Sequence, residues 1–555
     1  MEKIWLNSYS PGVPAEINPD AYQSLTELID QSVQRYADRP AFYNLGVTLT
    51  YSEMDNLSRD FAAFLQQGLQ LKKGDRIAIM LPNVLQYPIV LFAALRAGLI
   101  VVNVNPLYTA GELVYQINNS ESAAIVALSS FAATVEKALP EMKTLKHIII
   151  TDLGDLFPWP KSWMTNFTLK YIYRKIPNYR LPNVISFKQG LKRGRDLGFK
   201  RVDISNDDTA FLQYTGGTTG VSKGAILTHR NIIANLQQAD AWFSGMLTGG
   251  QEIIITALPL YHIFSLLANC FFFTKLGGLN VLVTNPRDVS TIIKEMRRFK
   301  FTAITGVNTL FNALLNDPRF ATLDFSHLHL ALGGGMAVQR VVAEKWQGVT
   351  GAPLLEAYGL TETSPCVTIN PANLKSYNGT IGLPVSSTEL AILDDDGNEL
   401  PVGSSGELAV KGPQVMKGYW NNPEETASVF TKDGWLLTGD VGAMDAKGYV
   451  RILERKKDMI LVSGFNVYPN EIEDVLVRLP GVKECAVIGI PDEHSGEAVK
   501  AFIVKADPKL DVDKVIQYSR EHLTPYKVPK QVEFCKELPK SNVGKILRRA
   551  LKEHA

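Results

Sequence analysis

The first regularity along the chain is the spacing of its apolar residues. Ser24 with Glu27, and Thr50 with Glu53, form the pattern of a capping box, in which a hydroxyl and a carboxylate satisfy free amides at a helix start. Apolar residues follow each pair at intervals of three and four, which gives one apolar helix face. The pattern predicts an amphipathic helix directly after each cap.

Short apolar runs lie between the later helical patterns. They cover residues 77–81, 99–104, 124–128 and 147–150, and further strand signals follow at 210–215, 301–304 and 328–332. Continuous rather than alternating hydrophobicity is typical of strands that are buried on both faces of a parallel sheet. The alternation of such strands with helices predicts an α/β fold with two doubly wound sheets.

The pattern changes near residue 380. Short strands punctuated by glycine predict a small β-barrel-like subdomain or a twisted sheet there. A charged stretch at 454–458 separates them from strand signals at 486–490 and 502–505 and a helix signal near 515–523. We expect a large N-terminal domain over residues 1–454, a hinge linker at 455–458 and a small α+β C-terminal domain over residues 459–555.

Composition restricts the class of protein. The 555 residues are 46% hydrophobic and 20% charged, which excludes collagen-like, low-complexity and wholly disordered chains. The four cysteines lie far apart without a CxxC pair, and the N-terminus lacks the basic and apolar regions of a signal peptide. We expect a cytoplasmic location and no disulfide framework.

One uncharged segment, residues 253–274, is long enough to cross a bilayer. Pro259, Tyr261 and His262 interrupt it between a β-rich run and an aromatic helical run. These residues favour a buried strand, loop and helix over a transmembrane helix.

The net charge hides an uneven distribution. The chain carries 57 Lys and Arg against 56 Asp and Glu, and the resulting +1 gives no reason to expect a nucleic-acid partner. Residues 157–201 alone carry eleven bases, one acid and nine aromatic residues, so this insert has a charge of +10 and the remainder −9. Such an insert fits an anionic membrane surface; the alternative is packing on the protein's own acidic surface.

A run rich in glycine and hydroxyl residues precedes a lysine directly after the strand signal at 210–215. Glycines allow backbone amides to approach a polyphosphate, hydroxyls add donors and the lysine adds charge. The run lacks the Gly-Lys-Ser/Thr of a P-loop NTPase, and an ordinary turn is the alternative. The candidate phosphate-binding residues are Tyr214, Thr215, Gly216, Gly217, Thr218, Thr219, Gly220, Val221, Ser222, Lys223, Gly224 and Ala225.

Three later positions carry candidate chemistry, each with an ordinary alternative. Thr361 and Glu362 join a hydroxyl to a carboxylate, which suits a phosphate oxygen and Mg²⁺, although a helix cap explains the pair equally well. The glycines at 333–335 can lie flat against a planar base, and Asp440 can accept ribose hydroxyls. A turn is the alternative for both.

The order of the motifs is more specific than any one of them. Along the chain stand YTGGTTGVSKG, PLYH, GGGMA, EAYGLTETSP, GWLLTGD, ERKKDMILVSGFNVYPNEIE and PKSNVGKILRR. This succession resembles the adenylate-forming superfamily of acyl-CoA synthetases, peptide-synthetase adenylation domains and luciferases, from about residue 49 to residue 549. Three features most resemble bacterial long-chain fatty-acid–CoA ligases: the segment at 105–108, the sequence YTGGTTGVSKGAILTHRN of the phosphate run and its continuation, and the basic insert.

The resemblance implies an ATP-dependent, Mg²⁺-requiring ligase that joins a fatty acid to CoA through an acyl-adenylate. It gives Lys545, which alone would suit a solvated basic face, the role of stabilising the adenylation transition state; Thr361 would contact the α-phosphate and Glu362 would hold Mg²⁺. Besides the phosphate run, the matching ATP-site residues are Gly333, Gly334, Gly335, Glu356, Ala357, Tyr358, Gly359, Asp440 and Arg455. The matching acyl-pocket residues are His262, which alone would suit a core position, Thr305, Gly306, Val307 and Gly333.

The resemblance also implies a mobile C-terminal domain. It would rotate about a hinge at Lys457, so that the face containing Gly464, where CoA enters, replaces Lys545. With the basic insert, it predicts peripheral association with the cytoplasmic face of the inner membrane, and it admits a homodimer. Two alternatives stay open: a ligase of this superfamily for medium-chain or aryl acids, and a catalytically silent membrane-associated protein that binds fatty acid or nucleotide.

Overall fold

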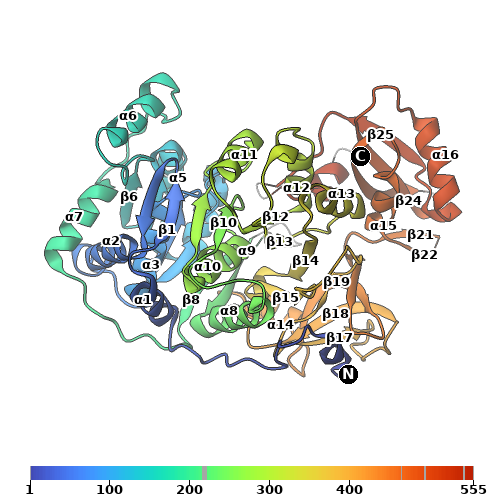
Figure 1. Cartoon of the computed structure of the whole chain (residues 1–555), viewed down its shortest axis with the longest axis horizontal. Coiled ribbons are helices and arrows are strands. Elements are labelled where there is room, and N and C mark those ends of the chain that lie inside the picture. The colour runs from blue at the N-terminus through green and yellow to red at the C-terminus, as the bar shows by residue number, and fades with distance from the viewer. Residues whose placement is uncertain (1, 216–221, 464, 493–494, 542–543, 554–555) are drawn as a thin grey trace.

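Two large, mostly parallel sheets form the N-terminal part of the computed structural model, which describes residues 2–215, 222–463, 465–492, 495–541 and 544–553 (Figure 1). In the first sheet a central parallel block is flanked by antiparallel strands at both edges. In spatial order its strands are Leu383–Pro384 (β16), Cys366–Ile369 (β15), Leu354–Gly359 (β14), Leu330–Gly333 (β13), Ala303–Gly306 (β12), Ile253–Thr256 (β10), Leu279–Leu282 (β11), Pro40–Asn44 (β1) and Val47–Thr50 (β2).

The second large sheet holds the first four predicted apolar runs. Its strands are parallel except for the edge pair of β8 and β9. In spatial order they are Ile185–Ser186 (β7), His147–Thr151 (β6), Ser122–Leu128 (β5), Arg76–Met80 (β3), Ile100–Asn103 (β4), Thr209–Thr215 (β8) and Lys223–Thr228 (β9). The predicted α/β fold with two doubly wound sheets is confirmed.

Helices connect the strands and cover the sheets. In the described residues the α-helices are Leu25–Tyr36 (α1), Tyr51–Ala63 (α2), Gln86–Arg96 (α3), Ala110–Ser120 (α4), Ala132–Ala138 (α5), Lys161–Phe167 (α6), Phe187–Leu197 (α7), His229–Phe243 (α8), Ile263–Ser265 (α9), Phe272–Leu276 (α10), Val289–Arg298 (α11), Asn308–Leu315 (α12), Arg340–Thr350 (α13), Pro423–Val429 (α14), Pro469–Leu476 (α15), Val512–His522 (α16) and Arg548–Lys552 (α17). Both predicted amphipathic helices are present as α1 and α2.

The two predicted helix caps differ in detail. Thr50 and Glu53 form the complete capping box of α2. At α1 the Ser24 hydroxyl accepts the Glu27 amide, but the Glu27 carboxylate accepts the amide of Gln23, one residue before the cap. The prediction of a reciprocal box at Ser24 is therefore wrong by one residue, because the chain enters α1 with the Gln23 amide facing the carboxylate.

Helix α3 packs the two large sheets into one core. All of its residues are buried, as expected of a helix that is apolar on every side. It lies between β3 and β4 of the second sheet along the chain, while its Phe92 ring lies 6.4 Å from the ring of Phe42 in β1 of the first sheet. The same Phe92 ring lies 6.0 Å from that of Phe271.

Two smaller sheets follow (Figure 1). The predicted glycine-rich β subdomain is an antiparallel sheet with the path Glu389–Leu393 (β17), Ser405–Lys411 (β18), Leu436–Met444 (β19) and Val450–Arg455 (β20). β17 and β20 stand at the two ends of this path, and Val450 of β20 also forms an isolated bridge with Gly382. The C-terminal sheet has the order Phe465–Val467 (β22), Ile460–Val462 (β21), Gly496–Lys505 (β24) and Val482–Asp492 (β23), and Gln531–Cys535 (β25) pairs with β24.

The uncharged segment at 253–274 folds as a buried strand, loop and helix. Strand β10 lies inside the first large sheet, and α9, the π-helical turn Leu266–Phe271 (η6) and α10 follow it. Among the described residues, no helix combines the length and apolar character that crossing a membrane requires.

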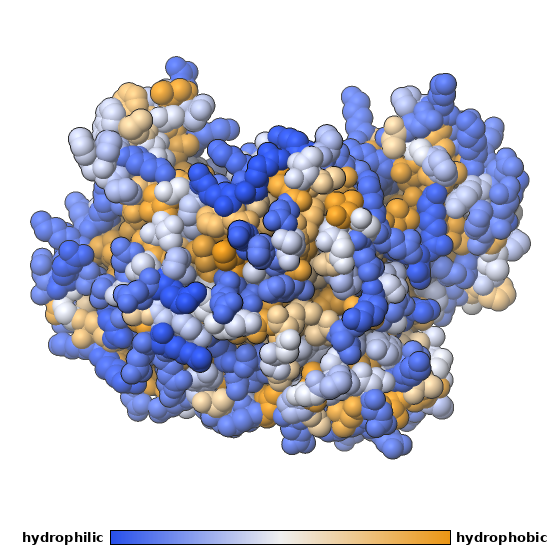
Figure 2. Space-filling view, viewed as in Figure 1, coloured by the Kyte–Doolittle hydropathy of each residue, from blue (hydrophilic) through white to orange (hydrophobic). Residues whose placement is uncertain are grey.

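The basic insert at 157–201 divides into two unlike parts. Helix α7 packs on α2, and a β-carbon built at Gly194 would lie 1.7 Å from the Asp60 carbonyl oxygen. Helix α6 and the π-helical turn Thr168–Ile172 (η5) instead project from the upper left of the molecule in Figure 1, and apolar atoms lie on this projection in Figure 2. We call residues 159–174 the aromatic projection.

Candidate functional site

Candidate residues of the first large sheet meet at the carboxyl ends of its parallel strands. Gly306 at the end of β12 is in register with Gly333 at the end of β13, and Gly333 is in register with Glu356 in β14. The Gly334 amide donates to the Gly306 carbonyl at 3.1 Å. This edge of a parallel sheet is where α/β proteins bind nucleotides, so the register brings the predicted base and acyl sites together.

Glu356 is held at this edge as a buried acid. Its Oε1 accepts the Val338 amide at 2.9 Å, and 5% of the residue is exposed. Burial raises the pKa of Glu356 to about 8, so the carboxyl is protonated at neutral pH. Ala357 follows it, and its carbonyl oxygen lies against Gly334. A neutral, hydrogen-bonded wall of this kind suits a planar base rather than a cation.

The two predicted ribose ligands lie side by side. Asp440 in β19 and Arg455 in β20 are cross-strand partners, with Arg455 Nε 3.3 Å from Asp440 Oδ1. The Tyr358 hydroxyl, two residues beyond Glu356, donates to Asp440 Oδ2 at 2.6 Å. One carboxylate thus links the large parallel sheet to the small antiparallel sheet, with Gly359 ending β14 beside it.

The predicted phosphate run is the connection between two antiparallel strands. Thr215 at the end of β8 pairs with Lys223 at the start of β9, and Tyr214 pairs with Gly224. This hairpin differs from the strand-to-helix turn of a P-loop NTPase, as its sequence predicted. Six members of the run, Gly216, Gly217, Thr218, Thr219, Gly220 and Val221, lie outside the described residues.

The described flanks of the run are well anchored. The Ser222 carbonyl accepts the Tyr115 hydroxyl at 2.9 Å, and the Tyr214 hydroxyl donates to Asn119 Oδ1 at 2.6 Å. The Lys223 ammonium pairs with the Glu425 carboxylate of α14 and lies 5.5 Å from the centre of the Tyr419 ring. Ala225 forms an isolated bridge with Tyr419.

Thr361 and Glu362 begin a 3₁₀ turn, Thr361–Thr363 (η8), directly after β14. Glu362 Oε1 accepts the Tyr419 hydroxyl at 2.7 Å, and the Glu362 carbonyl accepts the Met416 amide at 2.8 Å. In the described residues no three acidic, His or Cys side chains cluster as a metal cage. One carboxylate beside hydroxyls is the donor set of a Mg²⁺ that arrives with substrate phosphates, and these residues fit that ion.

Lys545 reaches this site from the C-terminal sheet's side of the chain. It stands in a tight turn in which the Ser541 hydroxyl accepts its amide at 3.1 Å and the Ser541 amide donates to its carbonyl at 2.7 Å. Burial, with the nearby cations Arg455 and Lys457, lowers the pKa of Lys545 to about 8 against the opposing effect of Asp440. The ammonium therefore shares its surroundings with both predicted ribose ligands.

One hydrogen bond joins the lysine turn to the N-terminal part of the chain. The Thr309 hydroxyl at the start of α12 donates to the Gly544 carbonyl at 3.1 Å. Gly544 has a φ of +84°, which glycine adopts without strain. A β-carbon there would also lie 2.7 Å from Thr309 Oγ1, so the glycine is what lets the turn come this close.

The predicted acyl-pocket residues differ in their contacts: some lie near the lysine turn, and others use their polar atoms inside the fold. Burial and the Lys545 ammonium lower the pKa of His262 to about 4, so its imidazole is neutral at pH 7. Val307 lies 3.3 Å from where a Gly544 β-carbon would stand. The Thr305 hydroxyl donates to buried Asn269 at 2.8 Å, so its polar atom is used inside the fold.

The predicted hinge follows the last strand of the small antiparallel sheet. Arg455 still belongs to β20, so the linker expected at 455–458 begins as strand and turns at residues 456–458. Arg548 of α17 ties both sides of this turn together, 3.0 Å from Glu454 and 2.9 Å from Glu473. Gly464, the predicted CoA-side residue, lies outside the described residues.

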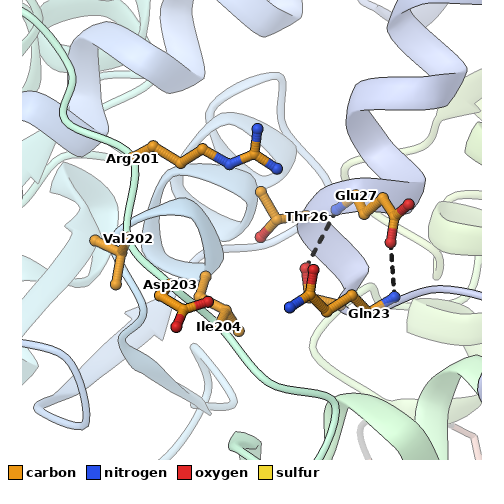
Figure 3. Close-up of a pocket in the computed structure, with 8 residues that line it drawn as sticks. Gln23, Thr26, Glu27, Arg201, Val202, Asp203 and Ile204 are labelled. Atoms are coloured by element: carbon orange, nitrogen blue, oxygen red, sulfur yellow. Dashed lines mark hydrogen bonds between the residues drawn. The ribbon is translucent and has the colours of Figure 1, made fainter.

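A cavity of about 330 Å³ lies apart from these residues (Figure 3). It is bounded by the start of α1 and by residues 201–204, with Thr26 and Asp203 among its walls. None of the candidate site residues described above lines it.

A family model described as AMP-binding enzyme matches residues 29–420, and one described as AMP-binding enzyme C-terminal domain matches residues 471–545. The chain belongs to the AMP-binding enzyme family. This AMP-binding enzyme is 58% identical to the long-chain-fatty-acid–CoA ligase of Salmonella typhimurium over 555 residues, which cover 100% of this chain and 99% of the relative. The long-chain-fatty-acid–CoA ligase of Haemophilus influenzae is 50% identical, with 100% and 98% covered.

Solved structures agree with this membership. The crystal structure of ATP-bound MatB from Rhodopseudomonas palustris superimposes with a TM-score of 0.81 at 29% identity, covering 95% of this AMP-binding enzyme and 98% of that chain. The expected resemblance to the adenylate-forming superfamily is confirmed.

Sequence patterns missed three residues that touch the site. Tyr419 lies in a stretch whose pattern predicts only short strands, and Glu425 lies outside the predicted strands and motifs. Thr309 lies at a helix start for which the sequence shows no motif. Each acts across 57 to 235 residues of chain. A local pattern carries no signal for contacts of that separation.

Proposed function

We propose that this AMP-binding enzyme is a long-chain fatty-acid–CoA ligase that works through an acyl-adenylate. The observation that carries the proposal is the environment of Lys545, whose ammonium interacts with Asp440 and Arg455 and also acts on His262. A cation common to the predicted ribose ligands and the predicted acyl pocket suits the point where a carboxylate meets the α-phosphate. The identities of 58% and 50% to named long-chain-fatty-acid–CoA ligases support the choice of substrate.

The first step joins the fatty acid to AMP. A carboxylate oxygen attacks the α-phosphorus of ATP, the bond to the bridging oxygen of the β-phosphate breaks, and pyrophosphate leaves with that electron pair. Negative charge grows on the α-phosphate oxygens, and a preorganised cation there lowers the barrier. In this proposal Lys545 supplies that cation and the Thr361 hydroxyl donates to the same phosphate.

The nucleotide would be held by the residues at the strand ends. Gly333 to Gly335 and the wall formed by Glu356 to Gly359 would take the adenine, Asp440 and Arg455 the ribose, and Lys223 with the phosphate run the outer phosphates. Glu362 would hold Mg²⁺, which neutralises phosphate charge when it is bound. This assignment rests on the register of Gly333 with Glu356 at one edge of the first sheet, and on the Asp440–Arg455 pair that the Tyr358 hydroxyl joins to that sheet.

The second step transfers the acyl group. The CoA sulfur attacks the acyl carbonyl carbon, the carbon–oxygen bond to AMP breaks, AMP leaves and the thiol proton passes to solvent. We propose that rotation about Lys457 withdraws Lys545 and brings the face containing Gly464 to the site. The Arg548 pairs with Glu454 and Glu473 span the turn that would have to move.

The acyl chain would enter beside His262 and Val307. A neutral imidazole with apolar neighbours can border an aliphatic chain without the cost of a buried, unpaired charge. Each additional buried CH₂ contributes on the order of 0.8 kcal/mol, equivalent to about fourfold in affinity, so a deep pocket favours long chains.

The test of this function is a substrate series with the purified protein. Pyrophosphate release with ATP alone, and acyl-CoA formation with CoA added, would be measured for fatty acids from about eight to about eighteen carbons and for aryl acids. We expect both activities to rise with chain length. Highest activity on aryl or medium-chain acids would reassign the substrate. If no acid leads to pyrophosphate release, the protein binds fatty acid or nucleotide without catalysing the reaction.

We further propose that the aromatic projection adsorbs to an anionic membrane surface. Trp159, Trp163 and Tyr173 are 85%, 62% and 65% exposed. Of the eleven bases of the insert, Lys188 and Arg195 form ion pairs with acids of the described chain, and the other nine form none there. Lys161 of the projection donates to the Leu45 carbonyl, whereas Lys170 and Arg174 would each contribute about 1 kcal/mol near anionic headgroups.

Vesicle sedimentation tests the membrane proposal. Trp159→Ser with Trp163→Ser should reduce sedimentation with vesicles of phosphatidylglycerol and phosphatidylcholine by about tenfold, because two interfacial aromatic anchors are lost. Lys192→Gln with Arg193→Gln on α7 is the comparison, since these bases lie off the projection and should matter less. Unchanged sedimentation of the tryptophan variant would overturn the membrane role.

A further inference from the structure

The stretch that follows β18 and runs into the first turn of α14 lies against the proposed phosphate and Mg²⁺ site. We call residues 416–426 the bracing segment. Its backbone pairs with β9: the Ile226 amide donates to the Gly418 carbonyl at 2.9 Å, and the Trp420 amide donates to the Gly224 carbonyl at 2.8 Å. The segment is thus fixed beside the strand that begins with Lys223, although the nearest part of β9 is almost two hundred residues away in sequence.

Two charged groups of the proposed site each have a partner on the bracing segment. Glu362 is held at both ends, by the Met416 amide on its carbonyl at 2.8 Å and by the Tyr419 hydroxyl on Oε1 at 2.7 Å. Lys223, whose side chain is 9% exposed, pairs with Glu425 and faces the Tyr419 ring. One short segment therefore sets the orientation of the carboxylate and of the lysine.

The hydrogen bond from Tyr419 has a fixed direction. A phenol O–H donates and a carboxylate oxygen accepts, and the Tyr419 hydroxyl lies 2.7 Å from Glu362 Oε1. Tyr419 is therefore the donor and Glu362 the acceptor. Oε1 is engaged, and no described residue bonds Oε2, which the carboxylate can offer to a cation. A partner that orients a ligating carboxylate is known to strengthen metal binding.

We propose that Tyr419 is a positioning residue, whose hydroxyl orients the Glu362 carboxylate for the Mg²⁺ that accompanies ATP. The inference rests on the proposed function, because it requires Glu362 to be the protein's ligand for that ion. Tyr419 itself touches neither phosphate nor metal in this assignment. It acts through Glu362, and this separates it from a residue that binds nucleotide directly.

The test uses the full-length protein and removes one oxygen. Tyr419→Phe keeps the ring that faces Lys223 and deletes only the donor to Glu362. We expect the Mg²⁺ concentration for half-maximal pyrophosphate release to rise by about tenfold. In calorimetric titrations, ATP affinity should fall in the presence of Mg²⁺ and stay unchanged in EDTA, a difference that a general loss of structure would not produce.

Two further variants decide how Tyr419 acts. Tyr449 is a partly exposed tyrosine just before β20, and Tyr449→Phe is the matched control, which should leave the Mg²⁺ dependence unaltered. Glu362→Gln should raise the Mg²⁺ requirement more than Tyr419→Phe does. The double variant should be no worse than Glu362→Gln, because a residue that acts through Glu362 has nothing left to position.

Each contrary result has its own meaning. If Tyr419→Phe matches Tyr449→Phe while Glu362→Gln raises the Mg²⁺ requirement, the positioning role is overturned and the Mg²⁺ role of Glu362 stands. If the effects of Tyr419→Phe and Glu362→Gln add in the double variant, Tyr419 acts independently and the inference is also overturned. If Glu362→Gln leaves the Mg²⁺ requirement unchanged, the proposed role of Glu362 fails, and the role of Tyr419 with it.

Discussion

Glu356 and Lys545 approach the same site from two regions that hold them differently. Glu356 is part of a parallel sheet, in register with Gly333, and is fixed by the Val338 amide. Lys545 stands on a turn beyond the C-terminal sheet, and the hydrogen bond from Thr309 to Gly544 joins that turn to the N-terminal part. In the proposed function, Glu356 in its strand borders the nucleotide and the Lys545 turn brings a cation to it, so we expect the two regions to respond differently to substitution.

The largest effect should come from removing the delivered cation. Lys545→Ala is expected to slow pyrophosphate release by about 10²- to 10³-fold, because an electrostatic group of the first transition state is lost. Thioester formation from supplied acyl-adenylate and CoA should be nearly unchanged. Lys540→Ala is the control, since Lys540 belongs to the same turn but pairs with Glu484 at 2.7 Å. Equal losses in both half-reactions would contradict a delivered cation.

The charge of the same lysine predicts a pH profile. Its pKa of about 8 means that Lys545 is cationic below pH 8 and neutral above it. The kcat/KM for adenylation, which reports the free enzyme, should therefore fall by about tenfold for each pH unit above that pKa. Lys545→Arg keeps its charge and should flatten the profile in this range. A wild-type profile that stays level through pH 8 to 9 would speak against the cationic role.

A substitution in the turn at 456–458 should restrict the movement of the C-terminal part that contains Lys545. Lys457→Pro fixes one backbone angle, and if the C-terminal sheet rotates about this point, thioester formation should slow by about tenfold while pyrophosphate release changes less. Lys457→Ala removes the side chain and keeps the backbone free, so it serves as the control. A proline variant that loses both activities equally would remove the reason to place a hinge here.

A smaller effect should follow from loosening the contact between the two regions. Thr309→Val removes the hydroxyl that donates to Gly544 and nearly keeps the shape of the side chain. One such hydrogen bond contributes about 0.5 to 1.5 kcal/mol, so adenylation should slow by about threefold. Thr309→Ser restores the donor and should restore the rate. If the serine and valine variants behave alike, the contact does not hold the lysine turn.

The smallest effect on activity should be at the fixed wall. Glu356→Gln imitates the protonated carboxyl and should change adenylation by less than about twofold. The native acid binds its proton more tightly when folded, with a pKa of about 8, than the ordinary value of 4.5, so stability should decline as pH rises between these values. Melting temperatures of the glutamine variant should lack that part of the decline. Identical pH dependence of the two melting temperatures would show that folding does not raise the pKa of Glu356 and that its carboxyl is ionised at neutral pH.

The sequence was informative where local pattern and structure share one cause. The apolar run at 77–81 became the buried parallel strand β3, because continuous hydrophobicity is what burial on both faces demands. The motifs that resemble the family predict Asp440 and Lys545 as site residues, because each residue stands inside its motif. The hydroxyl of Tyr419 could not be assigned, because its use depends on a fold that brings residues 57 positions apart into contact. Composition likewise predicts one basic insert at 157–201, whereas in the structure α7 packs on α2 and the aromatic projection stands apart from it.

Gly194 has a consequence for how such proteins vary and how they can be rebuilt. Because α7 lies so close to α2 at this glycine, that half of the insert cannot be exchanged without remaking the core that it covers. The aromatic projection is fixed at its base, where Asn166 accepts the Gly154 amide at 2.8 Å and Lys161 donates to the Leu45 carbonyl, whereas Trp159 and Trp163 are exposed. Homologues should therefore diverge more at the exposed positions of 159–174 than at position 194. Under the proposed membrane role, a graft of the projection should transfer membrane affinity between relatives.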